Sequence, residues 1–143
     1  MKKLSSVILS FFILISMCSC NTSFKLGNVE NAEIDYGVSE KYSKEDIDSA
    51  IQVVFDEFRT WFGFELYSIN YAGDEHCDED ELEYCNSLRE GAEFVDCIIF
   101  YSSFRTAPNA NDEGFEDNEV YSGWSWHLAR EADGTWQLLT WGY

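Results

Sequence analysis

The sequence predicts an α+β domain in which one long amphipathic helix packs against an antiparallel sheet. Three observations support this fold class. Apolar residues recur at helical spacing over about residues 43–61, alternating and apolar runs follow from residue 64 onward, and the chain ends in two aromatic-rich segments separated by a turn. With 45% hydrophobic and 17% aromatic residues, the chain has ample material for one core.

The helix is expected to run from about Ser43 to Trp61. Its apolar side chains recur at steps of three and four, which places them in one wide stripe. Ser43 and Asp46 form a capping box, so the start of the helix is well specified, and Gly63 ends it. The stripe comprises Ile47, Ala50, Ile51, Val54, Phe55, Phe58, Trp61 and Phe62.

Four strands are expected after the helix, over Phe64–Tyr71, Glu93–Thr106, Glu119–Arg130 and Thr135–Gly142. The last two form an antiparallel hairpin around a turn that contains Asp133-Gly134. The second strand is apolar at successive positions, so it is expected to be covered on both faces.

The sequence does not decide what packs on the second face of the sheet. If Val95, Ile99 and Tyr101 pack on the helix, the opposite face needs another cover, because large apolar patches are rarely left exposed. A homodimer through the outer sheet face is one candidate. The intramolecular candidates are the segment Leu82–Leu88 and the chain before Tyr42. The face in need of cover carries Phe94, Ile98, Phe100 and Phe104.

The first twenty residues read as an export signal. Lys2 and Lys3 precede an apolar run, Leu4–Met17, that is shorter than the roughly twenty residues needed to span a bilayer. Met17-Cys18-Ser19-Cys20 resembles the lipobox of bacterial lipoproteins. The resemblance implies cleavage before Cys20 and lipid, such as palmitate, on that residue. A plain secretory signal with incidental cysteines is the alternative.

These features predict the organisation and the location of the chain. Residues 1–19 are a signal peptide, residues 20–37 are the lipidated cysteine and a flexible tether, and residues 38–143 are one domain. The protein is therefore expected on the extracytoplasmic face of a bacterial cell membrane, held by lipid on Cys20. Cleavage leaves seven basic residues against 27 acidic ones, a net charge of −20, which disfavours nucleic acid as a partner.

The terminal hairpin suggests a family. It reads Tyr121-Ser-Gly-Trp-Ser-Trp-His-Leu-Ala-Arg130, then Gly134-Thr-Trp-Gln-Leu138, then Trp141-Gly-Tyr143. With the long first helix, this order resembles the nuclear-transport-factor-2-like fold, and more narrowly a group of small bacterial lipoproteins of unknown function. The resemblance covers about residues 38–143. It implies a curved antiparallel sheet that wraps the helix into a cone with a pocket at its open end.

Members of that fold act as isomerases, dehydratases, binding modules or dimerisation domains, so the fold alone does not choose a function. We expect a noncatalytic module that binds a small ligand or a cell-envelope protein, because no acid and base pair maps onto this chain. An isomerase- or dehydratase-like enzyme that uses the cone pocket is the alternative. The candidate pocket residues are Tyr67, Tyr71, Tyr101, Trp124, Trp126 and His127.

No cofactor is expected. His76 lies among acidic residues and Cys77, but the repeated Cys or His pairs of a zinc site are missing from the sequence. Two acidic loops, Asp78–Glu83 and Asn109–Glu119, offer carboxylate oxygens without matching a calcium-binding loop, so no tight calcium site is expected either.

Export permits disulfides, and Cys77–Cys85 is the expected bridge, with Cys97 left on an apolar strand face. One condition would exclude this bridge. If residues 77–85 formed one continuous helix, the two Cα atoms would lie about 12 Å apart, beyond the reach of a disulfide.

Overall fold

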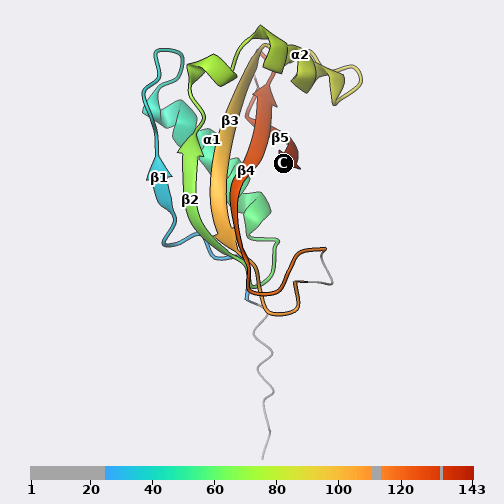
Figure 1. Ribbon diagram of the computed structural model, residues 1–143. Coiled ribbons are helices and arrows are strands. Elements are labelled where there is room, and N and C mark those ends of the chain that lie inside the picture. The colour runs from blue at the N-terminus through green and yellow to red at the C-terminus, as the bar shows by residue number, and fades with distance from the viewer. Residues whose placement is uncertain (1–24, 111–113, 133) are drawn as a thin grey trace, which may run out of the picture.

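A five-stranded sheet with an α-helix on each side forms the fold, as a computed structural model of the chain shows (Figure 1). The structure describes residues 25–110, 114–132 and 134–143. This arrangement confirms the α+β class. The elements are β1 (Glu33–Asp35), α1 (Lys44–Phe58), β2 (Glu65–Tyr71), a 3-10 helix (Asp74–His76), α2 (Glu79–Ser87), β3 (Asp96–Arg105), β4 (Val120–Arg130) and β5 (Gln137–Gly142).

The capping box at the start of α1 is present. The Asp46 N–H donates to Ser43 Oγ at 3.1 Å, and the Ser43 N–H lies 3.4 Å from Asp46 Oδ2. The helix ends at Phe58, one turn before the predicted end. Trp61 and Phe62 therefore belong to the turn that follows and not to the helical stripe. The buried side chains of α1 are Ile47, Ala50, Ile51, Val54, Phe55 and Phe58.

The strands lie in the order β1-β2-β3-β4-β5. Neighbouring strands from β2 to β5 are antiparallel, whereas β1 pairs with β2 in parallel. The purely antiparallel sheet predicted from the sequence is therefore wrong at this edge. A three-residue strand such as β1 is too short to show a period in sequence.

Residues 25–37 pack against the domain, although the sequence predicts a flexible tether there. The Gly27 N–H donates to the Arg59 carbonyl at 3.1 Å, and Val29 is buried. A β-carbon on Gly27 would lie 2.1 Å from the Phe58 carbonyl oxygen, so only glycine fits this approach. Backbone pairing rather than an apolar run holds this segment, and the sequence signal for such pairing is weak.

The helix α1 does not cover the face that carries Val95, Ile99 and Tyr101, which was considered first from the sequence, but the opposite face of the sheet. Ile98, Phe100 and Phe104 of β3 are fully buried on the α1 side, where the Phe104 and Phe58 ring centroids lie 5.8 Å apart. Tyr101, on the other side of β3, is exposed. The face with the large aromatic side chains is thus the inner face. The sequence does not show which face is inner, because β3 has apolar residues on both.

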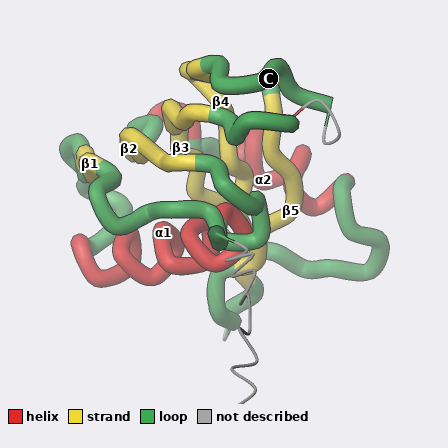
Figure 2. Tube along the Cα trace, turned by 90° about the horizontal axis from the view of Figure 1, so that it is seen from below, coloured by secondary structure: helices red, strands yellow, loops and turns green. Residues whose placement is uncertain are grey.

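The second face is covered at one end by α2, which lies across β3 and β4 (Figures 1 and 2). Cys85 of α2 is buried, as are Cys97 and Ile99 of β3 beneath it. Of the covers considered, the segment that includes Leu82–Leu88 fills this role. Beyond α2 the face is polar, with Ser68 and Ser103 joined by a 2.8 Å hydrogen bond.

Charged groups join the start of α1 to the sheet. Arg130 of β4 donates to Asp46 Oδ1 at 2.8 Å and to Asp96 Oδ2 at 2.9 Å. Its guanidinium also lies 4.3 Å from the ring centroid of Trp136. The Tyr42 hydroxyl reaches Asp96 Oδ1 at 2.6 Å. Asp46 of α1 and Tyr42, which lies just before the helix, are thereby joined to β3 and β4.

Candidate functional site

An aromatic cleft opens where α1 ends. Gly63 has a φ of +81° there, a conformation that strains any residue with a β-carbon, and it reverses the chain. Its N–H donates to the Lys25 carbonyl at 2.8 Å, so the beginning of the described chain lies beside the turn. The run Trp61-Phe62-Gly63-Phe64 therefore places aromatic rings on both sides of a sharp turn.

The cleft has a volume of about 310 Å³ and walls that are mostly aromatic. The Trp61 ring centroid lies 5.9 Å from that of Phe115 and 6.2 Å from that of Trp141. Phe64 lies 5.3 Å from Phe115. Rings at these separations attract one another beyond their burial. The described lining residues are Thr60, Trp61, Phe62, Phe64, Phe115 and Trp141.

The base of the cleft rests on the core. Trp61 packs against Phe58, Phe104 and Trp126 at centroid separations of 5.3, 5.6 and 5.3 Å, and these three side chains are fully buried. The Trp61 indole N–H donates to Glu57 Oε1 at 3.3 Å. Because close-packed rings shift only when the core opens, Trp61 is held in position before any ligand arrives.

The chemistry of the cleft suits binding more than proton transfer. Its described lining presents ring faces and the Thr60 hydroxyl, and it contains no titratable side chain. Apolar walls with few polar groups are typical of small-ligand sites. Trp124, which packs on Trp61, has a buried indole N–H without a hydrogen-bond partner among the described residues. Buried indole donors usually have a partner.

Two of the predicted pocket residues lie beside this cleft. Trp126 is fully buried beneath Trp61, and Trp124 packs on Trp61 with its centroid 6.0 Å away. Both contribute to the aromatic cluster behind the cleft. Neither belongs to its described lining.

The other four predicted pocket residues lie elsewhere in the structure, away from this cleft. Tyr71 is buried near the opposite end of β2, with its hydroxyl 2.7 Å from Asp74 Oδ1. Tyr101 and His127 point to the outer sheet face, and Tyr67 is exposed. The register shifts in β2 between positions 66 and 68, and in β3 between 102 and 103. Such irregularities change the face of a side chain without a sequence signal.

The sequence patterns did not predict any of the six described lining residues as pocket residues, including the aromatic Trp61, Phe115 and Trp141. Aromatic residues at helix or strand spacing are expected in a core, so nothing in the sequence distinguished these residues as part of a cleft. One signal was available: aromatic residues continue on both sides of Gly63. Because the helix is expected to end at this glycine, its buried apolar stripe should end there too.

His127 joins α2 to the outer sheet face. Its Nδ1 lies 2.7 Å from Glu81 Oε1, and its Nε2 lies 3.1 Å from Ser125 Oγ. Serine, histidine and carboxylate stand in the order of a hydrolase triad. However, the Ser125 hydroxyl also donates to the Gly142 carbonyl at 2.7 Å, and the Tyr84 ring packs on the imidazole. These contacts therefore fit a structural role, in which His127 connects β4 to α2.

The cysteines that were expected to form a disulfide are free thiols in the structure. Cys77 and Cys85 are both buried, and so is Cys97. Burial raises the pKa of all three thiols, that of Cys97 to about 12. A thiol that stays protonated at neutral pH is a poor nucleophile. Cys85 lies within α2, whereas Cys77 precedes its cap, so both belong to the packing between α2 and the sheet.

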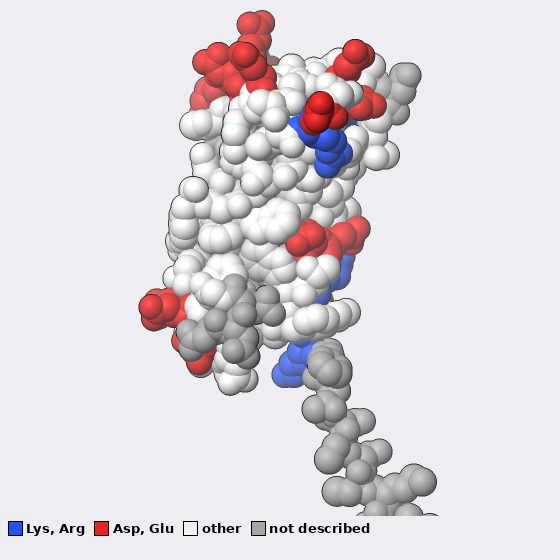
Figure 3. Space-filling view, turned by 90° about the vertical axis from the view of Figure 1, so that its right-hand side faces the viewer, with Lys and Arg blue, Asp and Glu red and all other residues white. Residues whose placement is uncertain are grey.

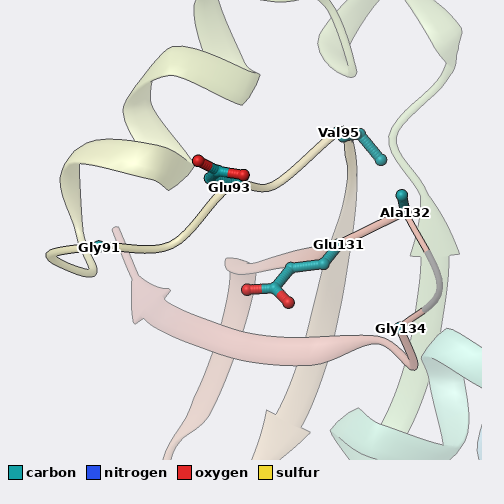
Figure 4. A pocket seen from close by; sticks show the side chains of 6 residues that line it. All are labelled: Gly91, Glu93, Val95, Glu131, Ala132 and Gly134. Atoms are coloured by element: carbon teal, nitrogen blue, oxygen red, sulfur yellow. The ribbon is translucent and has the colours of Figure 1, made fainter.

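A larger hollow lies at the other end of the sheet (Figure 4). It has a volume of about 570 Å³, and its described lining contains Glu93 and Glu131 but no aromatic side chain. Glu131 extends into the space between the two loops, as Figure 4 shows. Two carboxylates in an open hollow do not define a ligand, so this hollow is not a candidate site.

The acidic segment Asp78–Glu83 forms the start of α2, with Asp78 as its N-cap. Within the described residues, no group of three or more His, Cys, Asp or Glu side chains is placed to hold a metal ion. The second acidic loop, Asn109–Glu119, includes residues 111–113, and the turn Asp133-Gly134 includes residue 133; these four residues lie outside the described part.

The anchor prediction falls on residues 1–24, which also lie outside the described part. Among the described helices, none has the length and apolar character needed to cross a membrane. Comparisons of the chain with protein-family models, with curated proteins and with solved structures find no match.

Proposed function

We propose that the protein is an extracytoplasmic bacterial lipoprotein, anchored by lipid on Cys20, whose domain is a noncatalytic binding module. The support for the anchor is the basic start, the short apolar run and the lipobox-like Met17-Cys18-Ser19-Cys20. Two or more acyl chains bind a membrane stably where one does not. The acidic character of the domain suits an exported, soluble body beside that anchor.

We also propose a nuclear-transport-factor-2-like cone for the domain. The support is a single long helix on one face of a five-stranded, mostly antiparallel sheet and a terminal β4–β5 hairpin. The aromatic cleft occupies one end of this arrangement. In this proposal it is the open end of the cone, and α2 closes the other end.

The observation that carries the binding function is the preformed aromatic cleft between Trp61, Phe115 and Trp141. Its ligand is an apolar group or a sugar ring, because ring faces recognise either by stacking and burial. The proposed enzyme alternative would need an acid and a base facing that ligand. His127, the histidine among the predicted pocket residues, lies on the other sheet face, and both of its ring nitrogens contact other side chains.

Titration with N-phenyl-1-naphthylamine, a neutral apolar probe, tests this function. Replacing Trp141→Ala removes one wall, and we expect probe binding to weaken about two- to tenfold, since an aromatic contact contributes about 0.5–1.5 kcal/mol. Leu88→Ala is the matched control, because Leu88 and Trp141 are both 41% exposed and Leu88 lies beside α2. Equal binding by the two variants would contradict the proposed site.

A further inference from the structure

The cleft end of the molecule exposes more apolar surface than a monomer in water requires. Phe62 is 56% exposed and Leu26 is 60% exposed, and the Trp141 ring is 41% exposed. Leu26 follows Lys25, whose carbonyl accepts the hydrogen bond from Gly63, so these side chains lie at the same end as the turn. Clustered exposed apolar side chains, unlike scattered ones, indicate a binding surface.

The path of the chain connects this end to the anchor. The described chain begins at Lys25, beside the cleft (Figure 1). Lys25 is five steps along the chain from Cys20, and a fully extended chain covers at most about 18 Å in five steps. If Cys20 carries lipid, as proposed above, Lys25 beside the cleft lies within about 18 Å of the lipidated residue.

The distribution of charge favours the same orientation. Residues 74–93 contain nine of the 27 acidic residues and one basic residue, Arg89. This segment includes α2 and lies at the end of the molecule farthest from Lys25 (Figure 1). Figure 3 shows acidic side chains gathered at that far end with a basic group beside them, mixed charges midway, a smaller acidic group at the near end, and basic side chains beside the beginning of the described chain. An anionic lipid surface repels the acidic far end.

We propose that the cleft end, comprising Leu26, Trp61, Phe62, Phe64, Phe115 and Trp141, docks into the interfacial region of the membrane that holds Cys20. Tryptophan side chains favour this region, where a ring can be buried while its N–H stays close to polar groups. The occupant of the cleft is then bilayer lipid, with its acyl chain against the rings. This inference rests on the proposed lipid anchor and names the ligand class of the proposed binding site.

Tryptophan quenching by brominated lipid tests the docking directly. The full lipidated chain is reconstituted in vesicles of phosphatidylcholine and phosphatidylglycerol with or without bromine on the acyl chains. Bromine quenches only nearby indoles, so we expect quenching of the wild type and weaker quenching in Trp141→Phe, with Trp61 of the same surface accounting for the remainder. The matched variant Trp136→Phe removes a buried indole near Arg130 and should keep the quenching.

Surface variants separate docking from mere proximity. Phe62→Ser and Leu26→Ser should lower the quenching, whereas Val95→Ser, at a site 57% exposed near the other end of β3, should not. Circular dichroism checks that each variant is folded. Quenching that is unchanged in Phe62→Ser and Leu26→Ser would overturn the docking.

Mass spectrometry of the N-terminal peptide distinguishes the two proposals. If Cys20 is acylated and the wild type is not quenched, the docking surface is wrong and the anchor stands. If Cys20 carries no acyl group, the anchor is wrong and the docking falls with it. Acylation together with quenching that depends on Phe62 supports both.

Discussion

At the scale of single residues, Asp74 holds the chain before α1 in place. Its carboxylate accepts hydrogen bonds from Ser39 Oγ at 2.6 Å, from the Glu40 N–H at 2.8 Å and from the Tyr71 hydroxyl at 2.7 Å. These partners, led by the Ser39 hydroxyl, lower the pKa of Asp74. The residue looks like one member of an acidic run in sequence, yet it connects two segments that are more than thirty positions apart.

We expect Asp74→Ala to lower the free energy of unfolding by about 1.5–3 kcal/mol, the range for hydrogen bonds to a charged group. The loss follows because one substitution leaves the backbone N–H of Glu40 and two hydroxyl groups without their acceptor. Urea denaturation measures it. Glu40→Gln is the control, since Glu40 is exposed and its side chain makes no hydrogen bond to another described residue. A change as large in that variant would contradict the role of Asp74.

Acid should destabilise the wild type more than Asp74→Asn. Asp74 and Asp46 have lowered pKa values in the fold, Asp46 chiefly because Arg130 donates to it. A carboxyl with a lowered folded pKa contributes stability above its unfolded pKa of about 3.9, and this stability is lost as pH falls through the folded pKa. Melting temperatures measured from pH 6 to 3 should therefore fall less steeply for Asp74→Asn. Parallel curves would show that Asp74 does not carry this dependence.

At the scale of elements, α2 is held to the sheet by buried side chains and by the pair of Glu81 and His127. The helix has one buried residue, Cys85, whose thiol has a pKa raised mainly by burial. Its exposed side is acidic. A short helix of this kind depends on its tertiary contacts, because isolated helices of this length are marginal in water.

We expect Glu81→Gln to loosen α2 specifically. The variant weakens the contact to His127 Nδ1, which lies in a half-buried setting where charge-assisted hydrogen bonds contribute about 1.5–3 kcal/mol. Hydrogen exchange should become faster for amides of residues 82–87 while those of α1 keep their protection. Glu83→Gln, on the exposed side of the same helix, is the control. Uniform loss of protection across both helices would indicate global destabilisation instead.

At the scale of the whole molecule, the proposed location depends on a single residue, Cys20. We expect Cys20→Ala to abolish acylation and to release or misprocess the protein, because the domain itself is acidic and contains no described helix that could cross a membrane. Fractionation of cells into membrane and soluble material measures this. Cys18→Ala is the control and should stay with the membrane. Wild-type protein that is wholly soluble after export would contradict the anchor.

The three cysteines of the domain, Cys77, Cys85 and Cys97, illustrate how much the sequence predicts. It places Cys97 on an apolar strand face, and the structure buries it there. It also favours a Cys77–Cys85 bridge, on the assumption that the middle segment is an irregular loop. In the structure, α2 begins at Glu79, and both thiols are buried and free. The expected bridge therefore depended on the local structure assumed for this segment.

The sequence by itself determined the α+β class, the capped start of α1 at Ser43 and the terminal hairpin, because capping, stripes and alternation are local patterns along the chain. Only the tertiary structure decided which face of β3 is internal, where residues 25–37 pack, and which aromatic side chains meet in the cleft. The physical reason is that these depend on register, on backbone hydrogen bonds and on rings brought together from three distant segments. Trp61, Phe115 and Trp141 each resemble ordinary core residues in sequence, and they line a cleft only because the fold brings them together beside the turn at Gly63.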